Sequence, residues 1–101
     1  MLPTNSPHKW PKMGEIDIME HVSCDINKVH STVHTEAYNH MIGTQKGASY
    51  RLSSSNPVNE FHTYGVEWNK DKITGYVDGI KYFEFNNDYN NKLLKFNQYE
   101  I

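Results

Sequence analysis

The sequence predicts an all-β protein, built as an antiparallel β-sandwich or jelly roll. Aromatic residues make up 13% of the 101-residue chain, and this high aromatic content suits strands better than helices. Apolar and polar residues alternate in several short segments, at the period of a strand with one buried face. Turn-forming residues separate these segments, and no segment predicts a helix convincingly.

Two strands and a third, short one are predicted in residues 1–52. Residues 4–13 are rich in Pro, Asn and Ser and predict a loop. Residues 15–20 (EIDIME) alternate carboxylates with aliphatic side chains, and residues 29–35 (VHSTVHT) alternate again after a polar connection. Residues 36–49 are polar and predict a long loop, with a short strand near residues 50–52.

The second half predicts a three-stranded meander after a turn-rich connector at residues 53–59. Its predicted strands are residues 61–68, 73–77 and 80–85. A polar turn at residues 69–72 joins the first pair. Asp78 and Gly79 join the second pair, because a type I′ hairpin turn needs positive φ at its central residues. The Asn-rich residues 86–91 predict a loop.

Composition and charge exclude several classes of protein. The 10 Lys and Arg residues are balanced by 12 Asp and Glu residues, so no basic surface is expected for nucleic acid. No apolar run approaches the roughly 18 residues needed to cross a bilayer. Cys24 is the single cysteine, which excludes an internal disulfide framework. Residues 1–5 do not resemble a signal peptide.

The candidate catalytic residues are the carboxylates Glu15, Asp17 and Glu20. Strict alternation would place residue 19 beside the first two, so a β-bulge near residues 18–19 is needed to bring Glu20 to their face. Like charges in a row repel one another, and a purely structural sheet avoids them. Glycoside hydrolysis uses such a cluster, because one carboxylate must be ionised while another carries a proton.

A solvated acidic face is the alternative interpretation of the same residues. A straight strand separates Glu15 from Glu20 by roughly 15 Å, whereas retaining glycosidases hold their two carboxyl groups about 5–5.5 Å apart. The spacing therefore favours carboxylate chemistry without establishing a retaining mechanism.

A second row of polar side chains is predicted on the neighbouring strand, where His30, Thr32 and His34 share one face. In that position His34 would bond Glu20 or a sugar hydroxyl. His30 and His34 are roughly 13 Å apart along a strand, too far to share a metal ion with bonds of about 2 Å. We therefore expect no metal site. Surface or structural histidines are the alternative.

Residues 14–20 (GEIDIME) resemble the E-x-D-x-x-E signature of glycoside hydrolase family 16, and specifically of its laminarinase-like endo-β-1,3-glucanases. Residues 10–11 (WP) resemble the W-P-x-x-G-E approach of that family. Residues 29–35 resemble its V-H-G-T-x-H strand, with Ser31 in place of the glycine, and residues 61–68 (FHTYGVEW) resemble its F-H-x-Y-x-x-E-W strand. The matches follow the order of the family over nearly the whole chain.

This resemblance implies a concanavalin A-like β-jelly roll with a carbohydrate cleft, and double displacement with retention of configuration. Glu15 matches the nucleophile, Glu20 the general acid/base and Asp17 the assisting carboxylate. No cofactor is implied for this chemistry, although a structural calcium is possible in the complete domain. Family domains are more than twice as long, so residues 1–101 are interpreted as a partial catalytic domain with little activity alone.

Candidate substrate contacts flank the carboxylates. Trp10 leads into the carboxylate strand, and the apolar face of a sugar ring stacks well on an aromatic side chain. His30 and His34 line the neighbouring strand. Tyr38 and His40 lie in the long polar loop that follows, and such loops commonly carry binding residues. Core packing is the alternative for the aromatic residues.

The predicted function is endo-hydrolysis of laminarin-type β-1,3-glucan. We expect this polysaccharide as the partner, with no nucleic acid, no membrane and a monomeric state. The parent protein is expected to be secreted, or located at the cell surface or in the periplasm. A non-catalytic β-glucan-binding fragment is one alternative, although such relatives usually lose the carboxylates. Mixed-linkage glucan and agar- or carrageenan-type polymers are alternative substrates.

Overall fold

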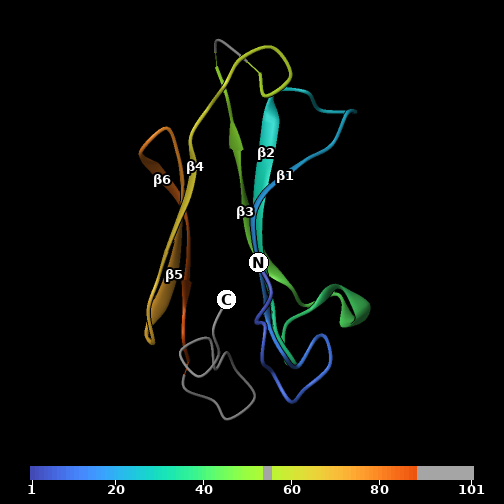
Figure 1. Cartoon of the computed structure of the whole chain (residues 1–101). Helices are drawn as coiled ribbons and strands as arrows, with labels where there is room; N and C mark the ends of the chain where they lie inside the picture. The colour runs from blue at the N-terminus through green and yellow to red at the C-terminus, as the bar shows by residue number, and fades with distance from the viewer. Residues whose placement is uncertain (54–55, 89–101) are drawn as a thin grey trace.

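The computed structural model describes residues 1–53 and 56–88, which form two three-stranded antiparallel sheets that face each other (Figure 1). Their strand orders are β1-β2-β3 and β4-β5-β6. The strands are β1 (Glu15–His21), β2 (Lys28–His34), β3 (Lys46–Arg51), β4 (Tyr64–Trp68), β5 (Lys72–Val77) and β6 (Ile80–Asn86). The predicted all-β sandwich is confirmed. Within the described ranges, no helix is long and apolar enough to cross a membrane.

The core lies between the two sheets. Alternation along each strand directs one row of apolar side chains inward, and removing these rows from water is the main stabilising contribution. One cluster of buried residues joins β1 and β2 to β5 and β6, and it contains Ile16, Val33, Ile73, Phe83 and Phe85. A second cluster contains Val29, Leu52 and Val77. The opposite face of β1 and β2 is thereby left for polar side chains.

The pairing of β1 with β2 is interrupted by a bulge. Asp17 pairs with Thr32, and the next registered pair is Glu20 with His30. Residues 18–19 therefore lie opposite the single residue Ser31, which defines a β-bulge. The bulge predicted near residues 18–19 is confirmed.

The hairpin predicted at Asp78 and Gly79 is also confirmed. Asp78 has φ of 49° and Gly79 has φ of 77°, and these two residues connect β5 to β6. The Asp78 carboxylate accepts a hydrogen bond from the backbone nitrogen of Thr63 at 2.9 Å and lies 2.7 Å from His62 Nδ1. These contacts link the hairpin to the chain that enters β4.

Two predicted strand starts were wrong, and the predicted long loop is shorter than expected. The predicted long loop contains a 3-10 turn, η1 (His40–Ile42), and β3 begins at Lys46 rather than near residue 50. Pairing along β2 decides this strand, since the polar sequence of β3 carries little strand pattern. β4 begins at Tyr64 because Phe61 is fully exposed and contributes nothing to the core. The predicted loop at residues 86–91 lies partly outside the described residues.

Candidate active site

The bulge brings the three candidate carboxylates to one face of the first sheet. Glu15 pairs with His34, Asp17 with Thr32 and Glu20 with His30, so both polar rows lie on the same side. Glu15 and Asp17 are half-buried, whereas Glu20 is exposed. The row therefore offers carboxyl groups in unequal environments.

Glu15 is held from outside its strand by Trp10. The indole Nε1 of Trp10 donates a hydrogen bond of 2.6 Å to Glu15 Oε2. The Trp10 ring also lies 4.8 Å from the ring of His40 and 5.8 Å from that of His34, measured between centroids. His34 and His40 contact each other edge to face at 5.3 Å. These three rings form a wall beside Glu15.

Asp17 has the most perturbed acidity of the carboxylates. Burial, the neighbouring charges of Glu15 and Glu20, and a hydrogen bond with Glu15 together raise the pKa of Asp17 from 3.8 to about 7. The positive N-terminus acts weakly in the opposite direction. Asp17 therefore carries a proton in mildly acidic solution and can donate it toward Glu15.

The partner of Glu20 differs from the one that we expected. Thr32 Oγ1 donates a hydrogen bond of 3.0 Å to Glu20 Oε2. His34 instead places Nε2 3.3 Å from Asp17 Oδ2, so the expected bond between His34 and Glu20 is not formed. The register explains the difference, because His34 lies opposite Glu15 at the other end of the row.

His30 borders a shallow polar groove beside Glu20. The groove has a volume of about 340 Å³. It is lined by His30, Ser31, Thr32, Gln45, Gly47, Ala48 and Ser49. Gly47 must lack a side chain, because a Cβ there would lie 2.6 Å from the carbonyl oxygen of Ser31. This close approach keeps the groove open next to Thr32.

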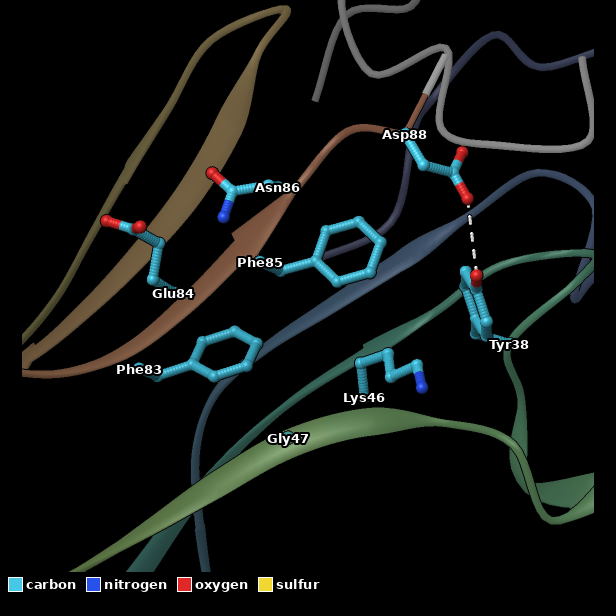
Figure 2. Close-up of a pocket in the computed structure, with 8 residues that line it drawn as sticks. All are labelled: Tyr38, Lys46, Gly47, Phe83, Glu84, Phe85, Asn86 and Asp88. Atoms are coloured by element: carbon cyan, nitrogen blue, oxygen red, sulfur yellow. Dashed lines mark hydrogen bonds between the residues drawn. The ribbon is translucent and has the colours of Figure 1, made fainter. Parts of the chain in front are cut away.

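The structure does not bring Tyr38 into the group around Glu15. Tyr38 contacts Phe85 edge to face at 6.0 Å, donates a hydrogen bond of 3.2 Å to Asp88 and lies under the ammonium group of Lys46 (Figure 2). A separate hollow of about 310 Å³ lies between β3 and β6, and Figure 2 shows the residues that line it. Of the expected sugar contacts, Trp10, His34 and His40 lie together, His30 lies beside Glu20, and Tyr38 lies apart.

Two supporting residues were not among the predicted site residues. Thr32 was noted only for sharing a face with the histidines, yet it bonds Glu20. Asn39 is buried, caps η1 through its side chain and donates to the carbonyl oxygens of Thr35 and Glu36. These bonds fix the loop that presents His40. An Asn directly before a short helical turn is the sequence signal for such a cap.

Glu15, Asp17 and His34 could together hold a metal ion. One potential ligand atom from each residue lies within 4.8 Å of the other two. The expectation of no metal site rested on the distance between His30 and His34 and did not include these three residues. The proton that Asp17 carries at mildly acidic pH competes with a cation there.

A row of carboxylates on one face of a β-sandwich is an arrangement that glycoside hydrolases use. The chain belongs to the family described as Glycosyl hydrolases family 16, whose family model matches residues 1–101. The family inferred from the sequence motifs is thus confirmed.

Known relatives share both sequence and fold with the chain. The Beta-glucanase of Rhodothermus marinus is 48% identical over 79 residues, which are 78% of this chain and 27% of that protein. The laminarinase structure from the same organism superposes with a TM-score of 0.77 at 44% identity, covering 86% of this chain and 35% of that one.

A mutant of SCLam, described as a non-specific endo-β-1,3(4)-glucanase, superposes with a TM-score of 0.82 at 42% identity. The match covers 89% of this chain and 34% of that one. Its crystal structure presents 1,3-β-D-cellobiosyl-glucose at the active site. The chain therefore spans about a third or less of the length of these relatives.

Proposed function

We propose that the protein carrying this chain is an endo-acting glycoside hydrolase that cleaves β-1,3-glucan with retention of configuration. The observation that carries the proposal is the bulge, which places Glu20 on the face of Glu15 and Asp17. Retaining glycosidases need a nucleophilic carboxylate and a second carboxyl group that transfers a proton. The row offers both, in environments of different burial.

In the first step, Glu15 is the nucleophile. Its carboxylate forms a bond to the anomeric carbon while the bond from that carbon to the glycosidic oxygen breaks. Glu20 donates its proton to the departing oxygen. The hydrogen bond from Trp10 to Glu15 Oε2 fixes one carboxylate oxygen and leaves the other for attack.

In the second step, Glu20 is the base. It accepts a proton from water while the water oxygen bonds to the anomeric carbon and the ester to Glu15 breaks. Glu20 is then protonated again for the next cycle. Asp17 assists this second step because its proton, held at a pKa of about 7, supports the departing Glu15 carboxylate.

The proposed substrate is a laminarin-type polymer. The wall formed by Trp10, His34 and His40 offers ring surface for a pyranose, and the polar groove beside Glu20 offers hydrogen-bonding groups for further sugar units. The laminarinase and endo-β-1,3(4)-glucanase relatives described above support a β-glucan as substrate. Secretion, a monomeric state and independence of cofactors remain predictions.

The decisive experiment measures reducing-sugar release from laminarin by the full-length protein and by two variants, Glu15→Gln and Glu20→Gln. We expect each variant to lose activity about 1,000-fold or more, because each removes a reacting group. Glu67→Gln is the matched control, because Glu67 is an exposed carboxylate of the other sheet. It should retain wild-type activity.

Products of several lengths and a first product of β configuration would support an endo-acting, retaining enzyme. Activity confined to mixed-linkage glucan or agar would contradict the proposed linkage. Binding of laminarin without any release of sugar would contradict the hydrolase and favour a glucan-binding protein.

A further inference from the structure

We propose that the groove on β2 and β3 binds the sugar units that leave when the glycosidic bond breaks, with Ser49 and Gln45 as its specificity-determining residues. The inference rests on the proposed function, because Glu20 is the group that protonates the leaving oxygen. It adds a direction for the polysaccharide. The part that remains bound to the enzyme lies beside Trp10, and the part that departs crosses β2 toward β3.

The strand register leads from the acid/base carboxylate to Ser49. Glu20 pairs with His30, and His30 pairs in turn with Ser49. Residues that are paired across strands direct their side chains to the same face of a sheet. These three side chains therefore form one row across the sheet. Neighbouring strands are about 4.8 Å apart, so Ser49 lies about 10 Å from β1 at the far end of this row.

A second row beside the first gives the groove its depth. Asp17 pairs with Thr32, and Thr32 pairs with Gly47. Gly47 has no side chain, and a Cβ there would lie 3.2 Å from Thr32 Oγ1. The surface is therefore lower over β3 than over β2. The volume of about 340 Å³ falls within the range of about 300–1,000 Å³ that is typical of ligand sites.

The two ends of the carboxylate row differ in character. The rings of Trp10, His34 and His40 lie together beside Glu15, with centroids 4.8 to 5.8 Å apart. The polar groove lies at the other end, where the Thr32 hydroxyl both borders the groove and donates to Glu20. Because the leaving oxygen receives its proton from the general acid, the groove is on the side to which the departing chain extends.

The chemistry of the groove fits a neutral ligand that is rich in hydroxyl groups. Ser49 and Gln45 are exposed and provide a hydroxyl group and an amide, each of which can donate and accept hydrogen bonds. His30 adds an imidazole. None of the described residues that line the groove is Lys, Arg, Asp or Glu, so a sulfated sugar would find no cationic partner there. The lining therefore favours an uncharged glucan.

The test uses the full-length protein and two substrates that differ on the leaving side. Laminarihexaose places sugar units in the groove, whereas dinitrophenyl β-laminaribioside has an aryl leaving group in their place. Ser49→Leu fills the groove, so kcat/KM on laminarihexaose should fall about tenfold. On the aryl glycoside it should change less than about twofold. Gln45→Met keeps the length of the side chain without its amide and should lower kcat/KM about threefold on laminarihexaose alone.

Ser53→Leu is the matched control, because Ser53 is an exposed serine that lies beyond the end of β3 and does not line the groove. It should leave both substrates unaffected. Laminarihexaose labelled at its reducing end gives a second measurement. In Ser49→Leu the label should appear in shorter products, because fewer sugar units then bind on the leaving side. Equal losses on both substrates in Ser49→Leu, or no loss on either, would overturn the proposal.

A binding measurement separates this inference from the proposed function. Laminarihexaose added to the Glu15→Gln variant should shift the backbone amide resonances of residues 45–49 as well as those near Trp10. Shifts confined to the surroundings of Trp10 would overturn the assignment of the groove and leave the hydrolase proposal intact. A wild-type protein that releases no sugar from laminarin would instead refute the proposed function.

Discussion

Asp17 and His34 face each other across the first two strands, with Asp17 Oδ2 3.3 Å from His34 Nε2. His34 is almost fully buried, and its Nδ1 atom has no hydrogen-bond partner among the described residues. Two further carboxylates lie near Asp17, and together with burial they raise its pKa to about 7. Ionisation of all three neighbouring carboxylates is therefore unfavourable, and a proton on Asp17 removes part of this repulsion.

The first prediction concerns stability against pH. Because folding raises the pKa of Asp17 from 3.8 to about 7, the folded state binds this proton more tightly. The resulting stabilisation is complete below about pH 4 and is lost as pH rises through 7. Partial exposure of the carboxyl group limits the effect to about 1–2 kcal/mol.

The Asp17→Asn side chain has no proton to lose in this range. The free energy of unfolding of the variant should therefore rise relative to that of the wild type between pH 4 and pH 8. Urea unfolding of both proteins at each pH measures the difference. A constant difference across this range would show that Asp17 titrates normally.

The second prediction concerns the support of Glu20. Thr32→Val keeps the shape of the side chain and removes the hydrogen bond to Glu20 Oε2. We expect kcat on laminarin to fall about 5- to 20-fold, since one hydrogen bond to a charged group contributes about 1.5–3 kcal/mol at most. Thr74→Val, a buried position in the other sheet, serves as the control. Equal activity of the two variants would argue against a role for Thr32.

The third prediction concerns Trp10. Trp10→Phe keeps an aromatic ring near His40 but removes the Nε1 donor to Glu15. We expect kcat/KM on laminarin to fall about 10- to 100-fold, because Glu15 loses both orientation and a bond to its charge. If Trp10 serves only as a stacking surface, the variant will bind and cleave laminarin nearly as well as wild type.

The fourth prediction concerns two glycines. A Cβ at Gly47 would lie 2.6 Å from the carbonyl oxygen of Ser31, whereas a Cβ at Gly65 would approach nothing closer than 3.9 Å. Gly47→Ala should therefore lower the free energy of unfolding by about 1–3 kcal/mol through overpacking. Gly65→Ala should be nearly neutral. Denaturant unfolding measures both, and similar values for the two variants would contradict this account of β3.

Local patterns in the sequence were sufficient to predict several of the strands and the last turn. Alternation in residues 15–20 and 29–35 predicted β1 and β2, and the turn at residues 78–79 predicted the last hairpin. These elements depend on interactions between near neighbours in the chain, which a single sequence displays. The row of carboxylates and the need for a bulge could also be predicted, because both follow from the spacing of residues within one short segment.

The sequence by itself therefore determined the all-β class and the family, and it predicted the three carboxylates of the candidate site. Only the tertiary structure decided which side chains support them. Because of the pairing register, Thr32 bonds Glu20 and His34 lies beside Asp17. The loop after β2 places His40 against the ring of Trp10, whereas Tyr38 packs against β6. Such contacts join residues whose separation in sequence carries no pattern, so they follow from the packing of strands and loops in three dimensions.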